Sequence, residues 1–465
     1  MIGLLLSASC SDRENKHVPV NGTTTSTSTP EQTFAKWMKE AEAGKIEAQF
    51  DVGNALEKGI GAAKDSSKAA EWYQKAASQG LGKAEAALGS AYIQGKGVPK
   101  DLIKGAELLV RAASRNDPSG EFQLGQAYRT GNGMEQDITK AVELFNKAAS
   151  QNYLPAMASL GDMYLEGKDV PLDPQRGLQL LQKAADGNDA RGLSNLAAVY
   201  HSGNGAAIDR KKSFELAIRA ATLGDDNAKF GVGIRYHTGD GVDQDPRKAA
   251  DWYQTAINSD DDEVVANAEA ELGAMYVYGT EIPKNLKAGI ELLEKAASKG
   301  SSYAMVTLAR QYYLGEGLPK DAAKSFALSI RASEQKNESF LGSFRAHGQV
   351  SVGDAYLRGI GVEKNLTKAA DYYRLAAIAG NAKAQQNLSW LYQYGKGVDR
   401  NLTIAYGWLN LSLAAPEGDA SNDAKGKAGR DKLENLMTPE EIAIAQEMSS
   451  SWKKGSDLVV NTSTK

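Results

Sequence analysis

Small residues preceded by Leu or Val recur along the chain at a nearly constant spacing. Successive positions are 36 residues apart, except for single intervals of 40 and 44 residues. An Ala or Gly precedes each position by five residues, and a Tyr follows it by three residues in nine of the ten cases. These offsets share one face of a helix with about 3.6 residues per turn, so the pattern predicts one amphipathic helix per repeat. The ten positions are Gly53, Gly89, Gly125, Gly161, Ala197, Gly233, Gly273, Ala309, Gly353 and Ser389.

The residues that follow predict a second helix in each repeat. Every repeat has a Gly six residues after the small position, which is typical of a left-handed cap at the end of a helix. Six residues further along, an Asp or Asn offers a side-chain oxygen to the free N–H groups of a new helix. Small residues, bulky pairs such as Trp72-Tyr73 and pairs of Ala then follow at helical spacing. The predicted N-caps are Asp65, Asp101, Asp137, Asp173, Asp209, Asp245, Asn285, Asp321, Asn365 and Asn401.

These patterns predict an all-α solenoid of about ten helix-turn-helix repeats over residues 33–415, with residues 33–44 forming a lone second helix before the first repeat. In a solenoid each unit packs only on its neighbours, so a chain of 465 residues can grow along one axis without dividing into globular domains. Two longer intervals mark insertions near 260–266 and 334–347. We expect these in loops, where insertions cost little, although a contact with a partner is a second interpretation.

The C-terminal residues predict helices that cap the array. Residues 416–455 are assigned to this cap, with one helix at 423–436 and a second that opens with the capping box at 438–441. Residues 456–465 are predicted to be a disordered tail. The apolar residues expected to seal the last hydrophobic face are Ile442, Ala445 and Trp452.

The N-terminus resembles the end of a bacterial lipoprotein signal. Apolar residues 2–6 and small residues 7–9 precede Cys10, the residue that such signals lipidate. A charged n-region is missing and the apolar run is short. A true start upstream of Met1 would explain both departures. The alternative is a cytosolic chain with an apolar start. Residues 1–10 are assigned to the signal remnant, and the polar, Thr- and Ser-rich residues 11–32 to a flexible tether.

Composition and charge argue against several classes of partner and binding site. The chain has 54 Lys and Arg against 58 Asp and Glu, and its formal net charge of -4 is spread without long blocks. Nucleic acid is therefore not expected as a partner, because binding it needs a clustered basic surface. With a single Cys, no internal disulfide and no thiolate metal cluster can form. We found no nucleophile or phosphate-loop motif, and no cofactor, metal or small-molecule substrate is expected.

Quoted whole, repeats such as residues 84–116 (AEAALGSAYIQGKGVPKDLIKGAELLVRAASRN) resemble the SEL-one-like repeat, a relative of the tetratricopeptide repeat. The shared marks are the ALGxxY segment, the Gly-x-Gly turn, the capping Asp and the KAxxWYxKAA segment. Two turns depart from the pattern, with Asp169 and Glu281 in place of the second Gly. The resemblance implies a right-handed superhelix and roles in adaptor, regulatory or host-contact complexes, without specifying a partner.

Tetratricopeptide-like arrays usually bind partners on the concave face lined by first helices, and residues at offsets of -3, +1 and +4 from the small position are expected there. These positions vary among repeats, as suits a recognition surface, but the Phe residues have the alternative of packing between helices. His201 and His237 occupy equivalent positions in adjacent repeats, too far apart to share a metal easily. The candidate protein-binding residues are Phe50, Phe122, Gln126, Arg129, Asp162, His201, Phe230, His237, Arg310, Tyr313 and Trp390.

The predicted function is that of a non-enzymatic scaffold or adaptor of the bacterial cell envelope that binds one or more proteins or peptides. Its expected location is the periplasm, with a lipid on Cys10 as the only contact with the outer membrane; a secreted or cytoplasmic protein is the alternative. A more specific hypothesis is a periplasmic immunity protein that neutralises a secreted toxin such as a lipase. A hydrolase is a third hypothesis, since some SEL-one-like proteins are linked to β-lactam hydrolysis, but those are disulfide-rich and this chain has no Cys in its repeats.

Overall fold

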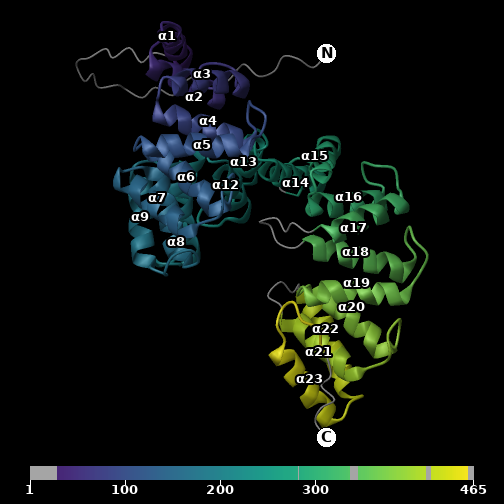
Figure 1. The fold of residues 1–465 in the computed structure, drawn as a ribbon. Coiled ribbons are helices and arrows are strands. Elements are labelled where there is room, and N and C mark those ends of the chain that lie inside the picture. The colour runs from purple at the N-terminus through teal and green to yellow at the C-terminus, as the bar shows by residue number, and fades with distance from the viewer. Residues whose placement is uncertain (1–28, 281, 336–343, 415–419, 459–465) are drawn as a thin grey trace, which may run out of the picture. The chain divides into compact units, whose positions relative to one another are not determined.

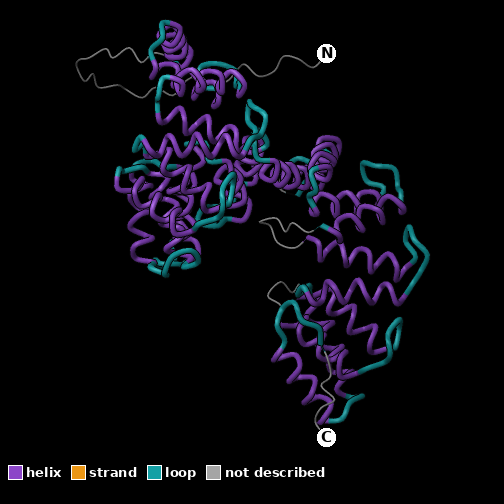
Figure 2. The backbone as a smooth tube through the Cα atoms, in the orientation of Figure 1, coloured by secondary structure: helices purple, strands orange, loops and turns teal. Residues whose placement is uncertain are grey.

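A computed structural model of the chain describes residues 29–280, 282–335, 344–414 and 420–458. Over these residues every regular element is an α-helix and no strand is present, as Figure 2 shows. The predicted all-α solenoid is thus confirmed. The handedness of the superhelix stays a prediction, as does the assignment of a concave face. Cys10 and most of the predicted tether lie outside the described residues.

Two helices form each repeat, in the order predicted (Figure 1). The first helices are α2 (Ile46–Lys58), α4 (Gly82–Gln94), α6 (Pro118–Thr130), α8 (Leu154–Glu166), α10 (Ala190–Ser202), α12 (Asp226–Thr238), α14 (Asp262–Tyr278), α16 (Ser302–Leu314), α18 (Phe344–Arg358) and α20 (Ala382–Tyr394). The second helices are α3 (Ser66–Ser78), α5 (Leu102–Ser114), α7 (Ile138–Ser150), α9 (Pro174–Asp186), α11 (Arg210–Thr222), α13 (Pro246–Ala256), α15 (Leu286–Ser298), α17 (Ala322–Glu334), α19 (Leu366–Ile378) and α21 (Leu402–Ala414).

The chain divides into two compact units, Met1–Ala156 and Met157–Lys465, and the division falls inside α8. Within the first unit, α1 (Pro30–Glu42) packs on α2 and the following helices pack in chain order to α7. The second unit repeats this arrangement from α9 to α21, and α22 (Ala420–Glu434) and α23 (Pro439–Ser451) then pack on α21. Each unit therefore consists of helices that contact mainly their neighbours in sequence, as a solenoid requires.

Gly and Asp residues define the turn between the two helices of a repeat. Gly95 ends α4 with φ of 72°, and Gly97 follows with φ of 71°. A Cβ at Gly97 would lie 2.0 Å from the carbonyl oxygen of Ser66 in the preceding repeat, so this turn also sets how closely two repeats approach. Asp169, which replaces the second Gly in the fourth repeat, does not adopt a positive φ, because a side chain there is costly. Glu281 lies outside the described residues.

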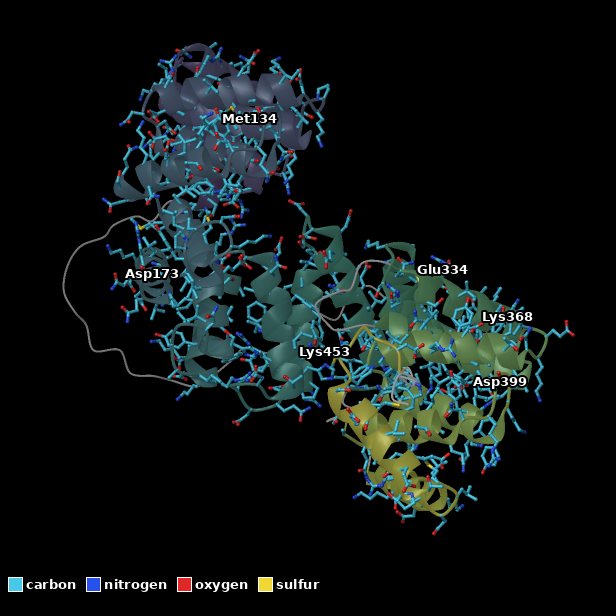
Figure 3. The ribbon with its side chains drawn as sticks, turned by 60° about the horizontal axis from the view of Figure 1, so that its bottom comes forward. Met134, Asp173, Glu334, Lys368, Asp399 and Lys453 are labelled. Carbon is cyan, nitrogen blue, oxygen red and sulfur yellow. The ribbon has the colours of Figure 1, made fainter. Side chains whose placement is uncertain are left out.

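The predicted N-caps of the second helices are confirmed. Asp101 Oδ1, for example, accepts a hydrogen bond of 3.0 Å from the backbone N–H of Lys104. The other nine Asp and Asn residues make the same contact with the residue three positions ahead. Asp173, labelled in Figure 3, is one of them and caps α9.

The structure differs from two predictions about the ends of the array. Helix α1 begins at Pro30 with a capping box of Thr29 and Gln32, three residues before the predicted start at 33. The predicted disordered tail is wrong at its beginning, because Leu458 is only 6% exposed and belongs to the last core cluster. Two hydrogen bonds hold this segment, from Gly455 N–H to the Ile378 carbonyl and from Trp452 Nε1 to the Ser456 carbonyl. The remaining residues, 459–465, lie outside the described part.

The predicted sealing residues at the C-terminus occupy the last hydrophobic face. Ala445 of α23 is fully buried, and Ile442 and Trp452 pack against the same cluster. The Trp452 ring contacts Trp408 of α21, with 6.3 Å between ring centroids.

The prediction that the insertion near 260–266 forms a loop is wrong. Helix α14 absorbs the extra residues, since it has 17 residues where most first helices have 13. Val264, Val265 and Ala266, in this added turn, are buried. Four residues are close to one full helical turn, so the insertion lengthens the helix while keeping its apolar face in register. The second insertion falls largely on residues 336–343, outside the described part.

Candidate protein-binding surface

The second compact unit contains a groove of about 380 Å³ lined by first helices α14, α16 and α18, by α17 and by the start of α20. Two of the predicted binding residues, Arg310 and Tyr313, lie in it. Both belong to α16, where they occupy offsets +1 and +4 from the small residue Ala309. The Arg310 guanidinium lies over the ring of Tyr278, with its central carbon 5.6 Å from the ring centroid.

Sequence reasoning missed the other charged residues of this groove, which are Arg358, Lys383 and Asp354. Asp354 accepts a hydrogen bond of 2.6 Å from the Tyr373 hydroxyl and lies 3.5 Å from Lys383 Nζ. Arg358 and Tyr278 are both at offset +5 from the small residue of their repeats. Offsets +1 and +5 are one helical turn apart and share a face, so this signal was present in the sequence.

Trp390 carries the same offset, +1, in the tenth repeat and is 41% exposed. Its ring contacts that of Tyr394, at offset +5, with 5.5 Å between centroids, and Tyr394 is 54% exposed. Lys396 Nζ lies 5.3 Å from the centre of the Trp390 ring. An exposed aromatic pair with a neighbouring cation is suited to contact with another protein, because Trp and Tyr contribute strongly to interfaces.

The Phe residues at offset -3 form a different group, because they pack inside the array. Phe122 is 7% exposed and contacts the rings of Phe145 and Tyr153, and Phe230 is 5% exposed and contacts Tyr253. Phe50 is half-buried against Tyr73. Packing between helices is therefore the interpretation that holds for Phe122 and Phe230, because the large ring at -3 fills the space beside the small residue of the repeat.

Three further candidates lie outside the groove. Gln126 and Arg129 are half-buried on α6 in the first compact unit, where Arg129 Nε donates to Gln126 Oε1 at 3.2 Å. Asp162 is exposed on α8, in the second unit. Among the predicted binding residues, Arg310 and Tyr313 are thus the two that line the groove.

His201 contributes to a charged cluster at the end of α10. Its Nδ1 lies 3.1 Å from Asp240 Oδ2 and 2.9 Å from Arg210 Nη1, and Arg210 is also 3.1 Å from the Asp240 carboxylate. Partial burial and, next, the Arg210 charge lower the pKa of His201, while Asp240 opposes them. The neutral ring is favoured, and it can accept a hydrogen bond from Arg210.

His237 makes separate contacts in the next repeat. Its Nδ1 lies 3.8 Å from Glu271 Oε2, and its ring meets Tyr253 edge to face. Each His therefore faces a carboxylate of the following repeat. Across the described chain, no three His, Cys, Asp or Glu side chains are grouped closely enough to hold a metal ion.

A row of basic residues, also missed in the sequence, lies outside the groove. In each of seven repeats, the third residue of the second helix places its charge over the Tyr of the first helix. In one example, Lys212 Nζ is 4.1 Å from the Tyr200 ring centroid. Lys368, labelled in Figure 3, takes this position over Tyr356, and Lys324 takes it over Tyr312. Cation–π attraction holds these cations against the array, whereas Arg358 in the groove has no such contact with a ring of the described residues.

The repeat matches a family model described as the Sel1 repeat. The model matches ten successive segments, at residues 46–81, 82–117, 118–153, 154–189, 190–225, 227–261, 266–301, 302–337, 346–381 and 382–415. The chain belongs to the Sel1 repeat family. Proteins with Sel1 repeats are generally protein-interaction scaffolds, and the fold is typically non-enzymatic.

Several solved structures are similar to this Sel1 repeat protein. A protective antigen of uropathogenic Escherichia coli, described as having an SLR fold, is 27% identical over 90% of this chain and 93% of its own, with a TM-score of 0.46. A Sel1 repeat protein from Oxalobacter formigenes is 27% identical over 50% of this chain and 93% of its own, with a TM-score of 0.40. An immunity protein from Pseudomonas aeruginosa is 23% identical over 52% and 81%, with a TM-score of 0.32.

Proposed function

We propose that this Sel1 repeat protein is a non-enzymatic scaffold that binds a partner protein through exposed residues of its first helices. The observation that carries the proposal is the groove of the second unit, where Arg310 and Tyr313 are exposed on a wall of regularly packed helices. Trp390 adds an exposed aromatic side chain at an equivalent offset. Rigid helices hold these side chains in place, so a partner meets a preorganised surface.

Site-specific cross-linking tests this assignment. A photoreactive benzoylphenylalanine is introduced at Tyr313 or at Trp390 of the full chain, and at Leu375 as a control, since Leu375 is 50% exposed on the second helix α19. Irradiation in the native cells is expected to give the same discrete adduct from the two first-helix positions and none from Leu375. Equal adducts from all three positions, or none from Tyr313 and Trp390, would contradict the assignment.

We further propose that the scaffold acts in the bacterial cell envelope, anchored to the outer membrane by a lipid on Cys10. Support comes from the apolar, then small residues before Cys10 and from the polar stretch after it. In the described parts of the chain, no helix combines the length and apolar character that crossing a bilayer requires. Incorporation of labelled palmitate that is lost in Cys10→Ala is the expected result. Unlabelled wild-type protein in the soluble fraction would overturn this placement.

The identity of the partner is a separate question. The hypothesis of a secreted toxin, such as a lipase, stays a prediction, and so does the hypothesis of hydrolase activity. An effector encoded beside this chain and inhibited by the purified protein would support the toxin hypothesis.

A further inference from the structure

The groove of the second unit has an excess of positive charge in a chain whose formal net charge is -4. Its lining includes the three cations Arg310, Arg358 and Lys383 and the single carboxylate Asp354. Asp354 is engaged by Lys383 and by the Tyr373 hydroxyl. Among the residues that the structure describes, neither Arg310 nor Arg358 has an ion-pair partner. Two guanidinium groups are therefore available to an incoming ligand.

The remaining lining combines apolar surface with hydroxyl groups. Tyr278, Tyr313 and Phe326 supply rings, and Ser325 and Ser351 supply hydroxyls. Because the Arg310 guanidinium lies over the Tyr278 ring, part of its side-chain freedom is already lost before a ligand arrives. The N–H groups of a guanidinium match a carboxylate in a two-pronged hydrogen-bonded pair.

We propose that this groove binds an acidic segment of the partner protein, with its carboxylates on Arg310 and Arg358 and an apolar side chain against Tyr313 and Phe326. This inference rests on the proposed function and adds the chemistry of the partner. Charge complementarity supports the proposal, since three cations and one carboxylate line the groove, which favours a ligand that carries negative charge. Nucleic acid fits less well, because it needs a long basic surface to neutralise successive phosphates.

Peptide binding to the full chain tests the proposal directly. The probe is a fluorescein-labelled peptide of about ten residues, enough to cross the groove when extended, with Glu residues on both sides of a central Leu-Trp pair. Matched peptides carry Gln or Lys in place of every Glu. Fluorescence anisotropy is expected to show binding of the Glu peptide that is at least about tenfold tighter than that of the Gln peptide and that weakens as salt rises. Binding of the Lys peptide is expected to be the weakest of the three.

Charge reversal in the protein locates the contact. Arg310→Glu/Arg358→Glu is expected to weaken binding of the Glu peptide by about tenfold or more and to strengthen binding of the Lys peptide. Lys324→Glu/Lys368→Glu is the matched control, because it makes the same change in net charge with residues outside the groove lining. This control is expected to retain nearly full binding, and circular dichroism checks that both variants fold.

Two results would overturn the proposal: equal affinity for the Glu and Gln peptides, or equal loss in the two charge-reversal variants. Its failure is distinguishable from failure of the proposed function. If cross-linking at Tyr313 and Trp390 succeeds while the Glu peptide shows no preference, the first helices bind a partner of another chemistry. If cross-linking fails as well, the scaffold assignment itself is wrong.

Discussion

Glu121 of α6, whose side chain is fully buried, lies with its Oε1 atom 2.7 Å from Nζ of Lys147 on α7. Its second carboxylate oxygen accepts a hydrogen bond of 2.7 Å from Gln151, just beyond α7. The equivalent buried position holds Glu85 in the second repeat and Glu269 in the seventh, each paired with a cation from the same repeat. In these repeats, a buried Glu of the first helix thus binds side chains at the end of the second helix and stabilises the packing of the two helices.

The first prediction concerns this buried pair. Lys147→Ala is expected to destabilise the protein by about 2 kcal/mol, since it leaves a buried carboxylate without its cation. Lys147 is about half exposed, so the effect should be smaller than for a fully buried pair. Denaturant unfolding of wild type and variant measures the loss.

A matched variant comes from the first repeat, where Gln49 and Gln79 are equivalent to Glu121 and Gln151 and share a hydrogen bond of 2.8 Å, so that an uncharged Gln occupies the position of Glu121. Glu121→Gln is therefore expected to be tolerated, and it should restore most of the stability when combined with Lys147→Ala. A double variant as unstable as Lys147→Ala alone would show that the lost charge pairing is not the cause.

The second prediction compares two glycines of α12. A Cβ at Gly233 would lie 2.6 Å from a ring carbon of Tyr253, whereas a Cβ at Gly231 meets nothing within 4 Å. Gly233→Ala is expected to cost about 1–3 kcal/mol through overpacking. Gly231→Ala is expected to add up to about 1 kcal/mol of stability, since Ala favours the helix. Opposite shifts in the unfolding midpoint are the expected result, and shifts in the same direction would contradict it.

The third prediction concerns the pH dependence of the His201 cluster. Because the folded protein lowers the pKa of His201, the unfolded chain takes up this proton first as the pH falls. The contribution of His201 to the free energy of unfolding is therefore fully present above about pH 6.5, the usual pKa of an imidazole. It declines as the pH falls below that value. Selective NMR titration of the imidazoles measures the pKa directly.

Two variants are expected to shift the pKa of His201 in opposite directions. Asp240→Asn removes the charge that favours the protonated ring, so the pKa of His201 should fall further. Arg210→Gln removes a positive charge and should raise it. The explanation fails if both variants move the pKa in one direction.

The fourth prediction concerns the C-terminal end. Leu458→Ala should destabilise the last repeat by about 2 kcal/mol, because it opens a cavity beside α21. Leu436→Ala removes the same atoms from a residue that is 56% exposed, and its effect should stay within about 0.5 kcal/mol. Hydrogen exchange in α21 and α23 measures the local change. Equal protection in the two variants would mean that Leu458 does not stabilise this end.

Much of the repeat could be predicted from local signals. Gly95 needs a left-handed backbone and Asp101 caps the helix that follows, and both requirements are met within a few residues of sequence. The 36-residue spacing then implies stacked helix pairs, and the family match agrees with it. The insertion near 260–266 was placed wrongly because sequence spacing alone does not show whether extra residues extend a helix or a loop.

The candidate site depended on packing between repeats. From the sequence, Phe122 and Arg310 look alike as variable residues on first helices, but Phe122 is covered by Phe145 and Tyr153 while Arg310 is exposed in a groove. Arg358 joins Arg310 only because α18 packs beside α16. Sequence determined the helices, turns and caps, since these follow from interactions within a few residues. Tertiary structure decided which side chains stay exposed and meet, because burial and proximity arise only when separate repeats pack.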